Sequence, residues 1–304
     1  MTHKEIVTNL RGIFPPAVTP FNRKGEVDIG CFRENVQRYV GIGLSGVVVA
    51  GSTGEAPFLT ERERLQLVEA ARAILRPPEL LIASTGLEST LLTLRLSREA
   101  IARGADVVLV ITPNYYKARM DSPTLQGHFR AVADGIRRPV VMYNIPQFTG
   151  IRMAPETIAA LSRHPNIAGL KESSGDLEYV RRILKAVRRG FRVLVGSPVI
   201  FFEALRAGAA GGVLGQAGYA PHICVGIFDA VQQGRLKLGR DLQQRLTFLA
   251  QNTALLYGVP GVKAAMDVCG YHGGPPRAPF MPLGPAQRRR VAAAVHEATR
   301  GLDV

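Results

Sequence analysis

Ile167-Ala168-Gly169-Leu170-Lys171-Glu172-Ser173 is the stretch of sequence from which the fold and the chemistry of this chain follow. The apolar run predicts a buried strand, and a cation inside such a strand is costly unless it is paired or neutral. A lysine that gives up its proton becomes a nucleophilic amine, which can form a Schiff base with a carbonyl substrate. Lys171 is therefore a candidate catalytic residue, with a strand-end lysine that reaches solvent as the alternative.

Similar short apolar runs recur along the chain, each followed by a helical pattern, which is the rhythm of repeated βα units. Thr60 and Glu63 predict a capping box at the start of one helix. The predicted strands are residues 12–20, 46–50, 80–85, 106–112, 139–144, 167–172, 192–196 and 212–215. The predicted helices are residues 61–75, 89–103, 122–136, 154–163, 176–188, 198–207 and 221–232.

Eight such units predict an α/β fold of the (β/α)8 TIM-barrel type with a C-terminal helical extension. The alternative is an open doubly wound sheet, which the absence of a GxGxxG sequence after the first strand disfavours. We expect a catalytic barrel domain over residues 1–234 and a three-helix extension over residues 235–304. Its predicted helices, 236–256, 261–268 and 285–300, are apolar enough to pack on the barrel or on another subunit.

The composition excludes several classes of protein. With 304 residues, 46% hydrophobic and 20% charged, the chain is typical of globular proteins, and no apolar run approaches the roughly 18 residues of a membrane span. Its start lacks the apolar segment of a secretory signal. Cys31, Cys224 and Cys269 have neither zinc-site nor disulfide spacing, which favours a cytoplasmic location.

A net charge of +14 raises the question of a nucleic-acid or anionic-membrane partner. The basic residues are spread over several predicted helices, without interleaved aromatic residues and without a recognisable nucleic-acid motif. The charge therefore predicts a solvated surface. A basic barrel that binds an anion or nucleic acid without catalysis stays open as the non-enzyme alternative.

Unusual residues follow the predicted strands at the end where barrel enzymes carry their active sites. GSTGE (51–55) follows the second strand and TPNYYK (112–117) the fourth, while Tyr143, Lys171 and Gly196 end the fifth, sixth and seventh. Because the strands of a barrel run parallel, all of these residues meet at one rim. Their convergence favours a functional site far more than any single motif does.

The residue types suggest roles. The turn formed by Ser52, Thr53 and Gly54 offers backbone N–H groups and two hydroxyls to an anion such as a substrate carboxylate; a plain tight turn is the alternative. Tyr143 lies on the inward side of its strand, where a phenol can move protons or simply plug the barrel. Tyr115 and the tyrosine beside it could serve only to pack a loop.

Taken as a set, these motifs identify a family. From about residue 12 to residue 283, the chain resembles the pyruvate-dependent class I aldolases of the dihydrodipicolinate synthase/N-acetylneuraminate lyase superfamily. The resemblance rests on five motifs: GSTGE (51–55), TPNYYK (112–117), YNIPQFTG (143–150), GLKESSGD (169–176) and GVPGVKAAMDVCGYHGGPPRAP (258–279).

The resemblance implies roles for single residues. Lys171 corresponds to the Schiff-base lysine that captures pyruvate and Tyr143 to the proton-transfer tyrosine. Ser52 and Thr53 correspond to the pair that holds the keto-acid carboxylate, with Ser52 also relaying protons. Tyr115 corresponds to the tyrosine lent to a neighbouring subunit, with the adjacent tyrosine as the alternative. The resemblance further implies a homotetramer and no metal or organic cofactor.

Two departures bear on the substrate. Phe148 stands where dihydrodipicolinate synthases carry an arginine that grips the carboxylate of aspartate semialdehyde, and an apolar ring cannot form that bidentate pair. Arg119 or Arg152 could substitute for it. Sialic acid lyases carry an acidic pair after the strand-seven glycine, whereas here Pro198 and Val199 follow Gly196-Ser197.

The sequence thus predicts a lyase of the aldolase type that forms or cleaves a C–C bond to pyruvate. Its expected substrate is a smaller or less polar 2-oxo acid, such as a 2-keto-3-deoxy sugar acid, 4-hydroxy-2-oxoglutarate or an aryl-substituted adduct. Two enzymatic alternatives stay open. One is 4-hydroxy-tetrahydrodipicolinate synthase, which condenses pyruvate with aspartate semialdehyde, and the other is a 2-keto-3-deoxy acid dehydratase.

Overall fold

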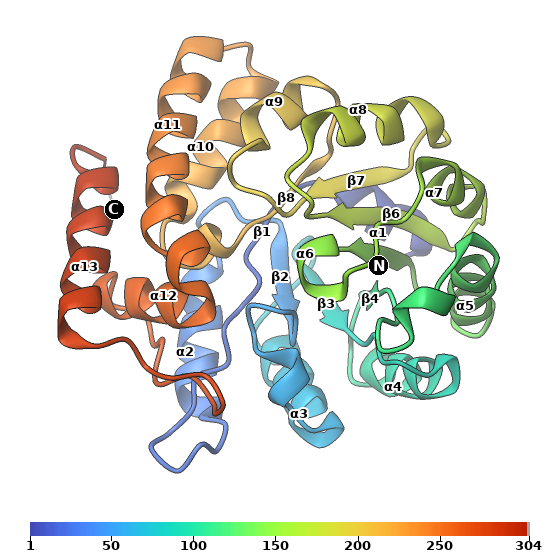
Figure 1. The fold of residues 1–304 in the computed structure, drawn as a ribbon, viewed down its shortest axis with the longest axis horizontal. Helices are drawn as coiled ribbons and strands as arrows, with labels where there is room; N and C mark the ends of the chain where they lie inside the picture. The colour runs from blue at the N-terminus through green and yellow to red at the C-terminus, as the bar shows by residue number, and fades with distance from the viewer. Residues whose placement is uncertain (303–304) are drawn as a thin grey trace.

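The computed structural model describes residues 1–302, and eight parallel strands form its centre (Figure 1). The strands pair in the order β1-β8-β7-β6-β5-β4-β3-β2. They are β1 (Gly12–Phe14), β2 (Gly46–Val49), β3 (Leu80–Ser84), β4 (Val107–Ile111), β5 (Val140–Asn144), β6 (Ile167–Glu172), β7 (Arg192–Val195) and β8 (Gly211–Val213). The predicted TIM barrel with C-terminal helices is confirmed.

The barrel closes between β1 and β2 through a segment that is not a regular strand. β1 ends at Phe14, earlier than predicted, because Pro15 and Pro16 have no backbone N–H to continue the ladder. The chain nevertheless stays alongside β2. Val48 donates its N–H to the carbonyl of Pro15 at 3.0 Å, and Ala17 donates to the carbonyl of Val48 at 2.9 Å.

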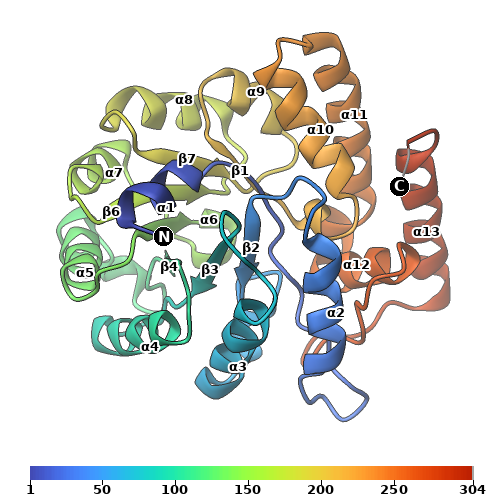
Figure 2. The ribbon, with the colours of Figure 1, turned by 180° about the vertical axis from the view of Figure 1, so that it is seen from behind.

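Helices cover the outside of the strands (Figures 1 and 2). The predicted capping box at Thr60 is confirmed, since Glu63 donates its N–H to the threonine hydroxyl at 3.2 Å and accepts from the Thr60 N–H at 2.8 Å. The outer helices are α2 (Ile29–Tyr39), α3 (Glu61–Arg72), α4 (Thr90–Ala102), α5 (Ser122–Asp134), α7 (Pro155–Ser162), α8 (Leu177–Ala186), α9 (Phe201–Arg206) and α10 (Pro221–Gln232).

Helix α1 (His3–Asn9), which was not predicted, closes the end of the barrel where the strands begin. Ile6 and Leu10 are fully buried and belong to one cluster with the inward-facing strand residues. Figure 2 shows α1 across that end. The opposite end, where the strands finish, is left for the functional site.

A register shift in β6 decides the direction of Lys171. The ladder between β5 and β6 skips one residue at Ala168. Ala168 packs in the barrel interior, yet Leu170, two residues further on, packs outside among the helices. Strict alternation would place both on one side of the sheet. The bulge therefore reverses the alternation and turns Lys171 toward the barrel axis, as bulges beside active sites do.

The chain after the barrel folds into α11 (Leu236–Asn252), α12 (Ala254–Val268) and α13 (Pro285–Thr299). The predicted helix over residues 236–256 is wrong at its end, because Thr253 breaks it with φ −127° and ψ −93°. Its hydroxyl lies 2.8 Å from that of Tyr219 and 2.6 Å from the carbonyl of Leu249. α12 is itself kinked at Gly258, with φ 62° and ψ −145°.

The three C-terminal helices pack on the barrel. Leu246 and Leu249 of α11, Val262 of α12 and Val291 of α13 share one buried cluster with Phe201 of α9. Of the two packing partners expected for the extension, the barrel is thus the one observed. This packing brings α12 beside the ends of the strands (Figure 1).

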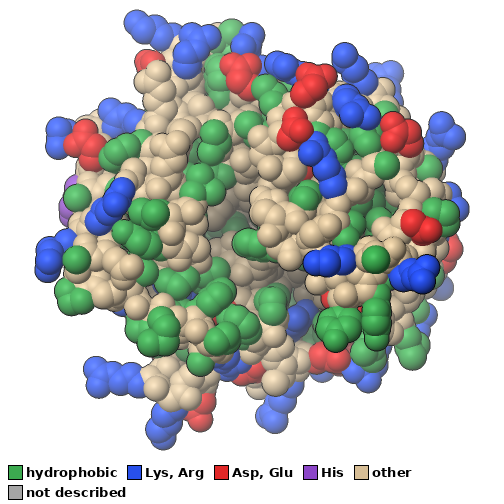
Figure 3. All heavy atoms as spheres, in the orientation of Figure 1, with side chains coloured by type: hydrophobic (Ala, Val, Ile, Leu, Met, Phe, Trp, Pro, Cys, Tyr) green, Lys and Arg blue, Asp and Glu red, His purple; other side chains and the backbone are tan. Residues whose placement is uncertain are grey.

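The surface carries the charge of the chain. Lys and Arg side chains are scattered over the face shown in Figure 3 and do not gather in one patch. Within residues 1–302, no helix is long and apolar enough to cross a bilayer. The thiols of Cys31, Cys224 and Cys269 are free, and that of Cys224 is fully buried.

Candidate active site

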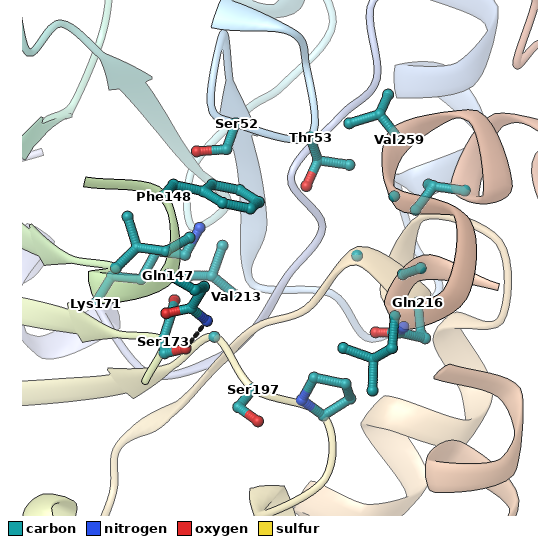
Figure 4. A pocket seen from close by; sticks show the side chains of 18 of the residues that line it. Ser52, Thr53, Gln147, Phe148, Lys171, Ser173, Ser197, Val213, Gln216 and Val259 are labelled. Carbon is teal, nitrogen blue, oxygen red and sulfur yellow. Dashed lines mark hydrogen bonds between the residues drawn. The ribbon is translucent and has the colours of Figure 1, made fainter. Parts of the chain in front are cut away.

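A cavity of about 280 Å³ opens where the strands end, between the barrel and α12 (Figure 4). One side of it is lined by polar side chains from the strand ends and the loops after them. The other side is apolar. The polar lining is Ser52, Thr53, Tyr143, Gln147, Lys171, Ser173, Ser174, Ser197 and Gln216, and the apolar lining includes Phe148, Pro198, Ala254, Leu255, Val259 and Val262.

Lys171 projects into this cavity from β6. It pairs with Tyr143 in the ladder between β5 and β6, and its Nζ lies 4.1 Å from the centroid of the tyrosine ring. Its side chain is only 4% exposed, so it can be reached only through the cavity. Lys171 is therefore not the strand-end lysine in solvent that the sequence left open.

Tyr143 connects Lys171 with the loop that follows β2. It lies in the barrel interior with Val141, as predicted. Its hydroxyl is 3.4 Å from Ser52 Oγ, and either group can be the donor. Figure 4 shows the Ser52 and Thr53 hydroxyls at the rim above Lys171. A phenol and a hydroxyl in contact beside an amine provide a route for protons to and from a ligand bound there.

The loop over residues 51–55 is held in an unusual conformation. Ala50 at its start and Glu55 at its end have φ of 54° and 60°, and they are the two non-glycine residues with positive φ in the described part of the chain. Such strain persists where the surrounding structure holds the backbone, often at functional sites. Gly54 does not line the cavity; a Cβ there would lie 2.8 Å from the carbonyl oxygen of Ala17. The close approach explains why glycine occupies this position, and the predicted contact of Gly54 with substrate stays a prediction.

Gly196 leaves room for the lysine. A Cβ at this position would lie 1.9 Å from Ser173 Oγ and 3.2 Å from Lys171 Cε. Ser173 Oγ is buried and has no hydrogen-bond partner among residues 1–302, so it is free to bond a ligand in the cavity. Glycine is thus required here for space and not for backbone conformation.

The sequence predicts a pyruvate imine at Lys171, and we expect Gly196→Ala to fold normally and to form that imine roughly tenfold more slowly or worse, because the added methyl crowds Lys171. Stopped-flow or quenched borohydride trapping measures this rate. The control is Gly127→Ala, where a Cβ meets nothing within 4 Å. Equal trapping rates for Gly196→Ala and the wild type would remove Gly196 from the site.

A short helix that the sequence did not predict, α6 (Pro146–Thr149), forms the lip of the cavity. Gln147 donates from Nε2 to the carbonyl of Ser173, which fixes α6 against the end of β6 (Figure 4). Phe148 lines the cavity but is 70% exposed, as expected for a residue at the mouth. Its predicted contact with a substrate stays a prediction.

The two arginines considered as substitutes for a carboxylate-binding residue do not reach the cavity. Arg152 pairs with Asp176 at 2.6 Å and lies 4.1 Å over the ring of Tyr179. Arg119 lies in an exposed turn and is not part of the lining. Neither substitution is supported. Among the lining residues, all within the described chain, Lys171 is the one with a charged side chain.

Tyr115 is also absent from the lining. It is 76% exposed, and its ring centroid lies 5.0 Å from that of Tyr116. Glu88 accepts the backbone N–H of Tyr115 at 2.8 Å, which fixes the loop. That Tyr115 contributes to the active site of a neighbouring subunit stays a prediction.

The α12 side of the cavity was not predicted from the sequence, and neither were Ser173, Ser197 and Gln216 as lining residues. The serines stand beside strand-end motifs and could have been included on that ground. The α12 residues could not, because they depend on how the C-terminal helices fold back. No group of three or more metal-ligating side chains occurs within residues 1–302.

A buried lysine at the end of β6, beside a tyrosine and a hydroxyl-bearing loop in a (β/α)8 barrel, is the arrangement of a class I aldolase. The model of the Dihydrodipicolinate synthetase family matches residues 9–298, so the chain belongs to that family. It is therefore an enzyme of the lyase and aldolase class, as predicted, and the non-catalytic alternative falls away.

Named relatives span nearly the whole chain. A 4-hydroxy-tetrahydrodipicolinate synthase of Methanothrix thermoacetophila is 36% identical over 274 residues, covering 90% of this chain and 92% of the relative. A probable mitochondrial 4-hydroxy-2-oxoglutarate aldolase of Emericella nidulans is 34% identical over 292 residues, covering 94% and 93%. The structure of YagE, an E. coli K12 prophage protein of the same family in complex with pyruvate, aligns with a TM-score of 0.90 at 26% identity, covering 95% and 98%.

Proposed function

We propose that Lys171 forms a Schiff base with pyruvate or a substituted 2-oxo acid, and that the enzyme cleaves or forms the C3–C4 bond of a 4-hydroxy-2-oxo acid. The observation that carries this proposal is the contact of a buried amine with a tyrosine that in turn meets Ser52. No metal or organic cofactor is required by the proposed chemistry. Pyruvate and an aldehyde are the proposed products of cleavage.

The chemistry follows from the side chains. The Lys171 amine attacks the C2 carbonyl, and the carbinolamine loses water as Tyr143 gives its proton to the departing hydroxyl, which leaves a protonated imine and a tyrosinate. The tyrosinate takes the proton of the C4 hydroxyl, the C3–C4 bond breaks, and its electron pair moves into an enamine while the aldehyde leaves. Protonation of C3 and hydrolysis of the imine then release pyruvate and the free amine. In this proposal the hydroxyls of Ser52 and Thr53, both in the cavity lining, hold the substrate carboxylate.

Lack of a second cation in the cavity favours aldol cleavage over condensation with aspartate semialdehyde. That aldehyde carries a carboxylate, which a guanidinium would bind through two parallel hydrogen bonds. The resemblance puts Phe148 at the position of that arginine, and Lys171 supplies the one charged side chain of the lining within the described chain. The similarity to the named 4-hydroxy-2-oxoglutarate aldolase also supports this choice.

A second candidate is 4-hydroxy-tetrahydrodipicolinate synthase, which the name of the Methanothrix relative favours. Neutral donors such as Gln147 and Ser197 would then have to bind the second carboxylate. A 2-keto-3-deoxy acid dehydratase would use the same imine. Product analysis separates the three reactions, because cleavage yields pyruvate, condensation consumes it, and dehydration leaves the carbon chain whole.

A substitution at the mouth distinguishes cleavage from condensation. We expect Phe148→Arg to raise kcat/KM for aspartate semialdehyde with pyruvate roughly tenfold or more, since a hydrogen bond to a charged group contributes about 1.5–3 kcal/mol. A coupled assay of the condensation measures it. Phe148→Gln, which removes the ring without adding charge, is the control. A wild type that already condenses aspartate semialdehyde efficiently, with no gain in the variant, would establish the synthase instead.

The quaternary structure is a separate proposal. We infer a homotetramer in which the exposed rings of Tyr115 and Tyr116 meet a neighbouring subunit. Their 76% and 69% exposure on the isolated chain supports the idea that a partner covers them.

A further inference from the structure

Two buried charges lie outside the mechanism, behind residues that line the cavity. Glu55 ends the loop that carries Ser52 and Thr53, and Lys263 lies in α12 next to the cavity-lining Val262. Their side chains are 0% and 1% exposed, and Lys263 Nζ lies 2.6 Å from Glu55 Oε1. Buried charges of this kind are expensive, because both groups are removed from water.

The pair is fully integrated into its surroundings. Besides its ion pair with Glu55, Lys263 Nζ donates to the carbonyls of Thr19 and Pro275, both at 2.8 Å. The other oxygen of Glu55 accepts the backbone N–H of Arg277 at 2.8 Å. Lys263 is thus held by these partners and does not line the cavity.

The ion pair of Glu55 and Lys263 connects the 51–55 loop with α12, and residues of both line the cavity. The 51–55 loop cannot hold its conformation through local preference, because Ala50 and Glu55 both adopt the left-handed region. Thr19 is bonded to the loop as well, donating its hydroxyl to the carbonyl of Gly54 at 2.7 Å. Lys263 therefore bonds both the end of the loop, through Glu55, and the segment that supports it, through Thr19.

We propose that Glu55 and Lys263 are positioning residues for the reaction: their ion pair fixes the loop of Ser52 and Thr53 against α12 and so sets where the carboxylate of the 2-oxo acid is held. This proposal rests on the proposed function insofar as the carboxylate belongs to an imine-forming substrate. The fastening itself belongs to the protein without ligand. Neither residue touches the reacting atoms, since neither lines the cavity.

The first test needs no ligand. Hydrogen–deuterium exchange is measured on the wild type, Glu55→Gln and Asp106→Asn, all as full chains. Asp106 is the matched control, because it pairs with Arg72 at 3.0 Å, is largely buried, and lies at the start of β4, at the opposite end of the barrel. We expect faster exchange in residues 50–56 and 259–263 of Glu55→Gln and not of the control. Unchanged exchange in residues 50–56 would overturn the proposal.

The second test separates positioning from stability. Removing one charge leaves the other buried and unpaired, whereas Glu55→Gln/Lys263→Met removes both and should recover much of the melting temperature. We expect pyruvate to bind roughly tenfold to a hundredfold more weakly in Glu55→Gln and in the double variant, because the loop is no longer held. Calorimetric titration with pyruvate measures the affinity.

Recovery of both affinity and melting temperature in the double variant would show that the pair serves stability alone and would overturn the proposal. The proposal would also be overturned if Glu55→Gln bound pyruvate with wild-type affinity while its residues 50–56 exchanged faster. If the wild type itself binds no pyruvate, the proposed function fails. In that case, hydrogen–deuterium exchange in residues 50–56 alone decides whether the ion pair of Glu55 and Lys263 holds the loop.

Discussion

Lys171→Ala is expected to abolish the pyruvate adduct and to lower turnover of a 4-hydroxy-2-oxo acid by at least about ten-thousandfold, the scale on which covalent enzymes lose activity without their nucleophile. The loss follows because no other lysine lines the cavity within the described chain. The protein should still fold, since a small side chain replaces a buried amine. Borohydride trapping followed by intact-mass analysis measures the adduct, and circular dichroism confirms the fold.

The matched control is Lys117→Ala. Lys117 is exposed and lies beside Gly150, at the end of the lip helix α6, so it is a lysine close to the mouth but outside the lining. We expect this variant to form the adduct and to turn over at the wild-type rate. If the adduct persists in Lys171→Ala and disappears in Lys117→Ala, Lys117 and not Lys171 forms the imine.

Tyr143→Phe carries the second largest expected effect. The variant should still bind pyruvate, because the amine and the loop after β2 are untouched, but kcat should fall by at least about a hundredfold, the usual scale of acid–base catalysis. The physical reason is loss of the hydroxyl that lies 3.4 Å from Ser52 Oγ. Steady-state kinetics with a 4-hydroxy-2-oxo acid, set beside imine trapping, separates turnover from capture.

Tyr179→Phe provides the comparison for Tyr143. The Tyr179 hydroxyl donates to the carbonyl of Met153 in the outer wall of the barrel and does not reach the cavity. Loss of this bond should lower stability by about 1 kcal/mol and leave kcat unchanged. An unaltered kcat in Tyr143→Phe would remove the tyrosine from the mechanism.

The sequence predicted most of the barrel because buried parallel strands are short, apolar and bounded by turns. Residues 167–172 and 221–232 match β6 and α10 at both ends. The failures have physical causes. Prolines ended β1 early, and Thr253 broke a helix because its hydroxyl bonds Tyr219. α1 and α6 are too short to show a clear period.

The site could be predicted as far as strand-end motifs could define it. The structure brings Lys171, Tyr143, Ser52 and Thr53 to one cavity, with Gly196 and Phe148 also in the lining. The bulge that turns Lys171 inward could not be predicted from the sequence pattern, because side chains do not alternate strictly between the two faces of the sheet at that point. The α12 residues that line the cavity could not be predicted either, because contacts between residues far apart in sequence depend on the finished fold.

The most direct test of the account is borohydride reduction of the wild-type protein with pyruvate, followed by peptide mass spectrometry. We predict one pyruvate-derived adduct per chain, located on Lys171. A folded protein that gives no adduct, or one that carries it on Lys263, would contradict the proposed imine chemistry.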